Sequence, residues 1–321
     1  MTNTYKREDF TNNTEVRWCP GCGDYAILAA LQRLLPELGV APEKHVFVSG
    51  IGCAGRLPYY MNTYGFHTIH GRATAVATGL KAMRDDVNVW VITGDGDALS
   101  IGTNHLVHCL RRNVNLTILL FNNQVYGLTK GQFSPTSQKG QVTKTSPEGV
   151  NNEPLNPLMV ALASGATFVA RGVDKDPVHL AAILKKAYEH KGCSFVEIYQ
   201  DCNIFNNGAF DAFAVKANRA DKTIVLEEGK PLIYGSERQY GLSLEGDNLS
   251  LCTADQSNCL HDQSNLIASM RLARLNFPDF PVPLGVYYQS ARQDYTLDKP
   301  IIKTTKDLPD LYRARASWQQ S

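Results

Sequence analysis

The sequence lacks any apolar run long enough to cross a bilayer, and it has no excess of charge of either sign. Its apolar runs, such as LTILLF at residues 116–121, are far shorter than the roughly 20 residues of a transmembrane helix. The first 18 residues have no apolar core typical of a secretory signal. Lys and Arg number 32 and Asp and Glu 31, so no global field favours nucleic acid or anionic lipid. We therefore expect a cytoplasmic protein with no membrane or nucleic-acid partner.

Short β-branched runs alternate with helical patterns through the first two thirds of the chain. The runs that indicate buried parallel strands begin at His45, Val89, Leu116, Thr167 and Phe195. This alternation predicts an α/β fold, with an open, mostly parallel sheet and helices on both faces. In such sheets ligands bind at the carboxyl ends of the strands. We expect residues 1–209 to form this domain and residues 210–321 to form a small C-terminal extension.

Two of the expected strand ends carry oxygen ligands. One strand ends at Gly94-Asp95-Gly96, and the next ends at a pair of asparagines that includes Asn123. The Asp95 carboxylate, the Asn123 amide and a main-chain carbonyl near Val125 form the kind of partial oxygen shell that Mg²⁺ prefers with phosphate oxygens. GDG followed about 25 residues later by two asparagines matches the thiamine diphosphate motif. The alternative is that the glycines are turn residues and the asparagines cap a loop.

Eight cysteines in a chain of this length do not suggest a disulfide scaffold, and in a reducing compartment they are expected as thiols or metal ligands. Cys19 and Cys22 form a CxxC pair before the first helix, Cys53 follows the first strand, and Cys202 follows the last. All four stand at element ends and can therefore converge on one centre. An iron–sulfur cluster often combines a CxxC pair with distant cysteines, whereas structural zinc more often uses two tight pairs. This spacing favours a cluster but leaves zinc and a thiol–disulfide pair open.

The order of these motifs resembles that of the β subunits of 2-oxoacid:ferredoxin oxidoreductases. The segments that carry the resemblance are WCPGCG, GIGC, HGRATAVATGLK, GDGDALSIGTNHLVHCLRRN, NNQVYGLTKGQFSPTS and DCNIF. The resemblance extends from Trp18 to Phe213, and PLIYGSERQYGLSL is similar to the C-terminal unit of the family. It implies a thiamine diphosphate-binding fold and Mg²⁺ on Asp95, Asn123 and the Val125 carbonyl. It further implies a [4Fe-4S] cluster whose ligands are Cys19, Cys22, Cys53 and Cys202.

The same resemblance implies which residues surround the organic cofactor. The expected thiamine diphosphate contacts are Ile51, Gly52, Cys53, His70, Gly71, Gly94, Gly96, Asp97, Asn123, Val125, Gly127, Leu128 and Thr129. His70 and Arg72, from the HGR motif, are expected as catalytic residues beside the cofactor rings. For His70 the alternative is a hydrogen-bonded histidine that closes a strand.

The reaction implied by the resemblance is an oxidative decarboxylation that depends on thiamine diphosphate and coenzyme A. It converts 2-oxoglutarate to succinyl-CoA and CO2, passes electrons through the cluster to ferredoxin, and in reverse fixes CO2. Thiamine enzymes also need a glutamate from a second α/β domain, and this chain has room for only one such domain. An α subunit that carries the pyrimidine-binding domain is therefore expected, with the αβ pair doubled to a heterotetramer.

Two basic residues are candidates for substrate binding. Arg56 follows Cys53 closely and is expected to meet a carboxylate or the phosphates of coenzyme A. Lys130 lies in a long connection, residues 125–156, whose length is typical of functional or disordered loops. A second cation favours 2-oxoglutarate over pyruvate, and KGQ at Lys130 is similar to the 2-oxoglutarate and broad-specificity branches. The alternative is that Lys130 is a solvated loop residue.

Three other functions remain open at this point. A β subunit specific for pyruvate, or one of broad specificity, would share all the cofactor motifs. A non-redox thiamine lyase would share GDG and the asparagines but lack the cysteine set. A zinc-stabilised binding subunit without catalysis would use the cysteines alone. Iron, sulfide and bound thiamine diphosphate in an anaerobic preparation separate the redox enzymes from the other two classes.

Overall fold

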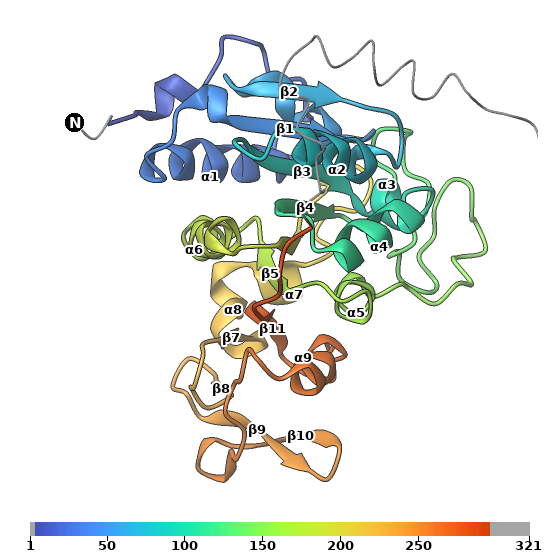
Figure 1. The fold of residues 1–321 in the computed structure, drawn as a ribbon. Helices are drawn as coiled ribbons and strands as arrows, with labels where there is room; N and C mark the ends of the chain where they lie inside the picture. Colours follow the sequence, from blue (N-terminus) through green and yellow to red (C-terminus); the bar gives the residue numbers. More distant parts are fainter. Residues whose placement is uncertain (1–3, 296–321) are drawn as a thin grey trace, which may run out of the picture.

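The computed structural model describes residues 4–295, and an eight-stranded sheet forms its centre (Figure 1). All five predicted strands are present and run parallel to one another. They are β1 (His45–Ser49), β3 (Asn88–Gly94), β4 (Leu116–Asn122), β5 (Phe168–Val173) and β6 (Cys193–Tyr199). The strand order is β2-β1-β3-β4-β6-β5-β11-β7. At one edge β2 (Tyr64–His67) is also parallel. Near the other edge β11 (Val282–Gln289) is antiparallel to β5 and parallel to β7 (Thr223–Leu226). The predicted open, mostly parallel sheet is confirmed.

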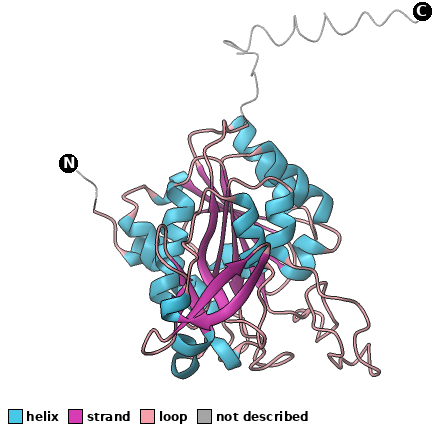
Figure 2. Ribbon diagram, turned by 90° about the horizontal axis from the view of Figure 1, so that it is seen from below, coloured by secondary structure: helices cyan, strands magenta, loops and turns pink. Residues whose placement is uncertain are grey.

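Helices cover both faces of the sheet, as predicted (Figure 2). One face packs against α1 (Asp24–Glu37) and α6 (Pro177–Glu189), and the other packs against α2 (Ala73–Met83), α4 (Thr103–Arg112), α5 (Pro157–Ala163) and α9 (Leu266–Ala273). Successive strand residues alternate between the two cores: Val89 and Val91 belong to one, Trp90 and Ile92 to the other. No helix in the part of the chain that the structure describes is long and apolar enough to span a membrane.

Short helices connect these larger elements. They are η1 (Arg7–Phe10), η2 (Pro42–Lys44), η3 (Ala54–Tyr60), α3 (Asp95–Leu99), α7 (Asp211–Ala214), α8 (Lys216–Lys222) and η4 (Ala254–Gln256). Two of them lie at the carboxyl ends of the strands, where ligands are expected: η3 comes after β1, and α3 begins directly after β3. The carboxyl ends of β1, β3, β4 and β6 therefore open onto the same edge of the sheet.

The chain after residue 210 is divided between two sheets. Its β7 and β11 extend the main sheet, while β8 (Ile233–Tyr234), β9 (Tyr240–Glu245) and β10 (Asn248–Thr253) form a separate antiparallel sheet (Figure 1). Val282 and Leu284 of β11 pack with Phe210 and Phe213 in a small apolar cluster. The division at residue 210 stays a prediction, and the strand pairing adds that the last third of the chain completes the main sheet.

Candidate active site

A cavity of about 590 Å³ lies at the carboxyl ends of β1, β3 and β4. Asp95 lines it, and so does every predicted thiamine diphosphate contact except Gly71. The lining residues that the sequence did not predict are Ala54, Phe121, Tyr126, Gln132 and Phe133. Segments as far apart in the sequence as Ile51 and Phe133 thus meet at the carboxyl ends of the strands, where ligands bind in such sheets.

Asp95 is a buried carboxylate that is held on one side by hydroxyls. Its Oδ2 atom accepts hydrogen bonds from Ser134 Oγ at 2.5 Å and from Thr136 Oγ1 at 2.6 Å. Burial raises the pKa of Asp95 to about 6, and the two hydroxyl donors oppose that rise. Ser134 and Thr136 are themselves buried, although they belong to the long connection after β4. This part of the connection therefore folds back beneath the cavity.

The two asparagines after GDG point to different partners. Asn122 donates through Nδ2 to Glu197 at 2.6 Å, and neither residue lines the cavity. Asn123 lines the cavity, and its Oδ1 accepts the Val125 N–H at 3.2 Å. Gln124, between Asn123 and Val125, has a left-handed backbone with φ 58°. This conformation turns the chain sharply and brings Val125 to the cavity wall. Asp95, Asn123 and Val125 therefore reach one cavity.

Gly96 has a local structural reason to be glycine. A Cβ atom there would lie 2.2 Å from the ring of Tyr126, whose hydroxyl donates to the Gly96 carbonyl at 3.0 Å. The close packing that requires glycine here is therefore made by an aromatic side chain that also lines the cavity.

Asp97 is fully engaged with groups of this chain. Its Oδ1 accepts from His70 Nδ1 and Gly71 N, both at 2.7 Å, and from Ile51 N at 3.1 Å. Its Oδ2 accepts from Thr93 Oγ1 at 2.6 Å. Since His70 lines the cavity and is tied through Nδ1, its Nε2 atom is the ring nitrogen available to a ligand.

The HGR motif is divided between the cavity and its surroundings. Gly71 is left-handed with φ 70°, and a Cβ there would lie 2.6 Å from Gly102 N, so only glycine fits. Arg72 precedes α2, is not among the lining residues, and has a buried Nη1 atom without a hydrogen-bond partner.

The four predicted cluster cysteines lie together beside the cavity. A Cβ on Gly127, which lines the cavity, would lie 3.4 Å from Cys53 Sγ and 3.6 Å from Cys202 Sγ. Burial raises the pKa of Cys22, and negative charge on Asp24, Cys53 and Cys202 raises it further. Burial likewise raises the pKa of Cys53 to about 12, with added effects from Asp24, Cys202 and Cys19. Burial also raises the pKa of Cys202. These three thiols lose their protons together only if a strongly cationic group compensates their charge.

The remaining cysteines stand elsewhere. Cys109 and Cys193 are buried in the main core, and Cys252 and Cys259 are half-buried near the small sheet. Among residues 4–295, no group of three or more His, Cys, Asp and Glu side chains is arranged to hold a single metal ion. The predicted Mg²⁺ site contains only one side chain of those types, that of Asp95. A four-iron cluster is larger than a single ion, so its four thiolate ligands lie further apart than the ligands of one ion. The donor types at the two places are those that Mg²⁺ and a cluster take, and both assignments stay predictions.

The two predicted substrate cations lie outside the cavity lining. Arg56 donates through Nε to the Tyr60 hydroxyl at 3.0 Å, and its charge acts to lower the pKa of Cys53, so it lies near the cysteines. Lys130 is exposed and has a left-handed backbone with φ 77° in the tight turn that follows the cavity-lining Gly127. This conformation is costly for a residue other than glycine, and residues in such conformations are enriched at functional sites.

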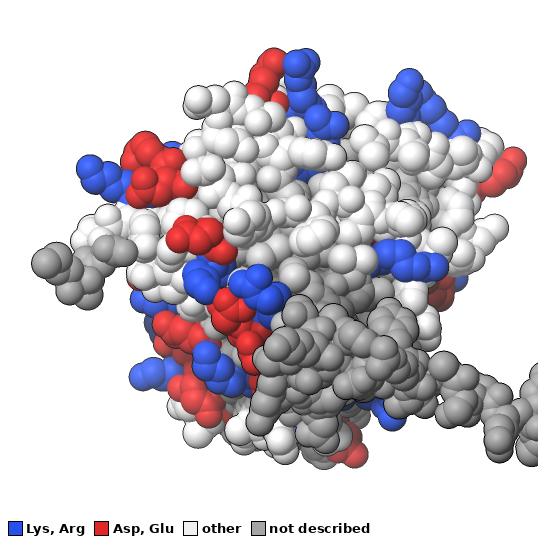
Figure 3. Space-filling model, turned by 45° about the horizontal axis from the view of Figure 1, so that its top comes forward, with Lys and Arg blue, Asp and Glu red and all other residues white. Residues whose placement is uncertain are grey.

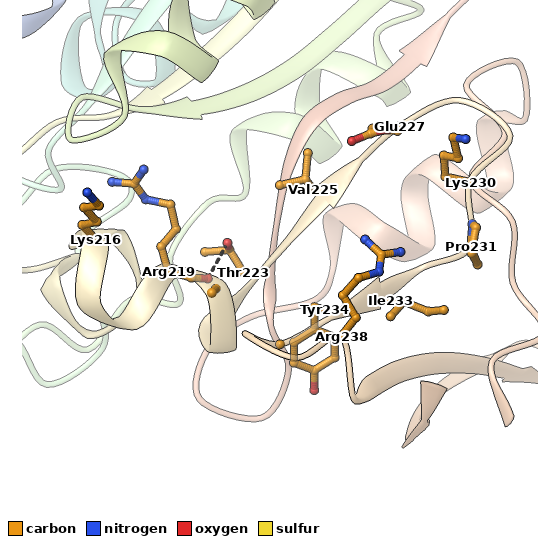
Figure 4. A pocket seen from close by; sticks show the side chains of 12 residues that line it. Lys216, Arg219, Thr223, Val225, Glu227, Lys230, Pro231, Ile233, Tyr234 and Arg238 are labelled. Atoms are coloured by element: carbon orange, nitrogen blue, oxygen red, sulfur yellow. Dashed lines mark hydrogen bonds between the residues drawn. The ribbon is translucent and has the colours of Figure 1, made fainter. Parts of the chain in front are cut away.

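A second groove, of about 650 Å³, lies along the β7 edge of the sheet (Figure 4). Lys216, Lys230 and Arg238 line it, as does Arg219, which forms an ion pair with Asp176. It contains none of the predicted site residues, and it is distant in strand order from the ends of β3 and β4. The cavity at the strand ends is therefore the candidate active site.

Comparison with known proteins agrees with this geometry. Residues 50–198 match the C-terminal TPP-binding domain of thiamine pyrophosphate enzymes. The KorB subunit of 2-oxoglutarate oxidoreductase from Mycobacterium tuberculosis is 55% identical over 251 residues, which are 78% of this chain and 67% of that one. The chain belongs to the β subunits of the 2-oxoacid:ferredoxin oxidoreductases. A further member, the β subunit of the 2-oxoacid:ferredoxin oxidoreductase from Saccharolobus solfataricus, is 48% identical over 59% of this chain and 63% of its own length.

The fold of this oxidoreductase β subunit has a solved counterpart over its whole length. The 2-oxoglutarate:ferredoxin oxidoreductase from Magnetococcus marinus, solved with 2-oxoglutarate, coenzyme A and succinyl-CoA bound, gives a TM-score of 0.76 at 34% identity. The match covers 99% of this chain and 98% of the solved chain. The predicted thiamine diphosphate-binding fold and family membership are confirmed.

Proposed function

We propose that this chain is the β subunit of a 2-oxoglutarate:ferredoxin oxidoreductase. With its partner it would convert 2-oxoglutarate and coenzyme A to succinyl-CoA and CO2, or carry out the reverse carboxylation, with ferredoxin as electron carrier. The observation that carries the proposal is Gly127, which lines the cavity and at the same time faces Cys53 and Cys202. Because Cys53 itself lines the cavity, the proposed thiamine site and the proposed cluster would adjoin, which gives a short path for electrons. A non-redox thiamine lyase has no use for these cysteines.

Thiamine diphosphate, when bound, supplies the electron sink for decarboxylation, and a [4Fe-4S] cluster supplies a one-electron carrier. The Mg²⁺ ligands of this chain would be Asp95, Asn123 and the Val125 carbonyl, and the cluster ligands Cys19, Cys22, Cys53 and Cys202. His70 would hold or move a proton at Nε2, because its Nδ1 is tied to Asp97 at 2.7 Å. Asp97 would then act by orienting His70 rather than by touching the diphosphate, since its oxygens already accept four hydrogen bonds.

An α subunit would complete the cavity. The residues that line the cavity in the described chain include no glutamate, whereas thiamine chemistry requires one. Leu128 and Phe133 on the cavity wall, and Ile69 and Ile101 around Gly71, expose 49%, 36%, 75% and 55% of their surfaces. Figure 3 shows a broad area with few charged side chains on the upper part of the molecule in that view. Exposed apolar side chains that gather beside a cavity are typical of a subunit interface.

We further propose 2-oxoglutarate as the preferred substrate. Lys130, in the left-handed turn after the cavity-lining Gly127, would be the cation that meets a second carboxylate. The relative from M. tuberculosis that is 55% identical is named a 2-oxoglutarate oxidoreductase. Arg56, near Cys53, is better placed for the phosphates of coenzyme A or for the cluster than for the cavity itself. A pyruvate-specific or broad-specificity enzyme is the alternative, and a cytoplasmic location remains part of the proposal.

The test is to co-express the chain with the subunit encoded beside it and to purify the complex without oxygen. We expect iron, sulfide and thiamine diphosphate in the complex, and reduction of an artificial electron acceptor with 2-oxoglutarate faster than with pyruvate. Thiamine diphosphate without iron would point to a non-redox lyase, and zinc without thiamine diphosphate to a binding subunit. Equal or faster turnover of pyruvate would refute the substrate assignment alone.

A further inference from the structure

Gln200 stands between the two proposed centres. It follows β6 directly, its backbone N–H donates to the Asn122 carbonyl at 3.0 Å, and its side chain is 1% exposed. Its Oε1 accepts from Asn123 Nδ2 at 2.9 Å, and its Nε2 donates to Cys22 Sγ at 3.3 Å. The second Nε2 hydrogen goes to the Asp201 carbonyl at 2.5 Å. One buried amide therefore contacts both a proposed magnesium ligand and a proposed cluster ligand.

We propose that Gln200 is a positioning residue that sets the geometry of the Mg²⁺ site and the reduction potential of the cluster at the same time. The inference rests on the proposed function and adds a residue that touches neither substrate nor cofactor. The inference is based on hydrogen-bond donors and acceptors, because Gln200 Oε1 and each of the two Nε2 hydrogens have one defined partner.

The effect on the metal site follows from the Asn123 amide. An asparagine side chain has one oxygen and one NH2 group, which lie in one plane and point in different directions. Because Gln200 accepts from Nδ2, the Asn123 oxygen is directed away from Gln200, where it accepts from Val125 N at 3.2 Å and keeps a lone pair for a cation. Without Gln200 the amide loses the contact that decides between its two orientations, and the cation meets an NH2 group in one of them.

The effect on the cluster follows from the Cys22 sulfur. A hydrogen bond to a thiolate stabilises negative charge on sulfur, and the reduced cluster carries one more negative charge than the oxidised cluster. The Gln200 N–H therefore favours the reduced state and raises the potential. Asp24, which is buried beside Cys22, acts in the opposite direction through its own negative charge. Gln200 is thus a neutral hydrogen-bond donor that partly offsets the effect of the negative charge of Asp24 on the Cys22 sulfur.

The experiment uses the anaerobically purified complex and the substitution Gln200→Met, which keeps length and volume but removes donor and acceptor. Two quantities are measured: the Mg²⁺ dissociation constant, by calorimetry on metal-free complex saturated with thiamine diphosphate, and the midpoint potential of the cluster, by a redox titration followed by electron paramagnetic resonance. We expect Mg²⁺ binding about 10- to 100-fold weaker, the range found when outer hydrogen-bond partners of metal ligands are removed. The midpoint potential should move to a more negative value.

A matched control is Ser194→Ala, which removes a buried hydroxyl on β6 that donates to the Ala187 carbonyl at 2.7 Å. It should leave both quantities at their wild-type values, because Ser194 contacts neither Asn123 nor Cys22. Should Gln200→Met not fold, Gln200→Asn, one methylene too short to span both partners, replaces it. A wild-type value for either quantity in a folded Gln200 variant would overturn the inference. A wild-type complex without iron or thiamine diphosphate would instead refute the proposed function, so the two failures are distinguishable.

Discussion

Asp95→Asn is expected to stabilise the metal-free protein at neutral and alkaline pH while it abolishes Mg²⁺ binding. Burial raises the pKa of Asp95 to about 6 from an ordinary value of 3.8. This difference of about 2 pKa units corresponds to about 3 kcal/mol between the protonated and ionised forms, at 1.4 kcal/mol per unit. Because Asp95 is only 2% exposed, solvent does not screen this cost. The neutral amide of asparagine avoids it.

The sign of the pH dependence follows from the raised pKa. The folded protein binds the Asp95 proton more tightly than the unfolded chain does, so this contribution to stability is complete below about pH 4 and lost as the pH rises through about 6. The stability gap between Asp95→Asn and wild type should therefore be about 3 kcal/mol at pH 8 and about half of that at pH 5. Asp24 and Asp174 also have raised pKa values, about 7 and about 6, but they are present in both proteins and cancel.

The assay is denaturant unfolding of the metal-free complex at pH 5 and pH 8, with and without Mg²⁺ and thiamine diphosphate. Added cofactor should stabilise the wild type alone, because the variant lacks the charged metal ligand. A variant no more stable than metal-free wild type at pH 8 would show that Asp95 ionises there at no cost. Cofactor-induced stabilisation of Asp95→Asn would remove Asp95 from the metal site.

Three further predictions concern the cluster, the substrate and the support of Asp95. Cys202→Ser should lose the iron–sulfur absorbance while Cys252→Ser keeps it; the opposite result would mean that the fourth ligand is misassigned. Lys130→Ala should lose roughly tenfold more kcat/KM on 2-oxoglutarate than on pyruvate, which corresponds to about 1.4 kcal/mol of charge-assisted bonding; an equal loss on both acids would exclude Lys130 from specificity. Ser134→Ala combined with Thr136→Val should weaken Mg²⁺ binding about 10- to 100-fold in calorimetry, and Thr136→Ser should not; unchanged affinity in the double variant would show that the hydroxyls do not support Asp95.

Local sequence patterns predicted the central strands well because each is a short apolar run with its own boundaries. β3 and β4 are continuous buried runs that end in GDG and in two asparagines, and the parallel arrangement then brings both ends to one edge. The insertion of β11 between β5 and β7 could not be predicted in the same way. It depends on pairing between residues more than 100 positions apart, such as Gly285 with Arg171, which leaves no periodic signal in either segment.

Within the site, ligand types were predictable and their supporting partners were not. The sequence indicated Asp97 as a residue near the diphosphate, but it gave no sign that Gly71, Ile51 and Thr93 satisfy its oxygens. Ser134 reaches Asp95 across 39 positions from inside a connection without helical or strand pattern. Gln200 is one residue beyond a strand and two before a cysteine, where a polar side chain is unremarkable. Such contacts follow from the path of the folded backbone and not from residue type.

Three buried carboxylates lie near the cavity, and their partners show where a cation is needed. Glu197 accepts from the Arg171 guanidinium at 2.7 Å, so its charge is matched within the protein. Asp97 accepts two backbone N–H groups, a hydroxyl and the ring of His70. Asp95 has hydroxyl donors on one oxygen and no cationic side chain at hydrogen-bond distance among the described residues, and burial raises its pKa. A buried carboxylate without a cationic partner is costly when ionised. Asp95 is therefore an uncompensated buried charge between the ends of β3 and β4, at the position proposed for Mg²⁺.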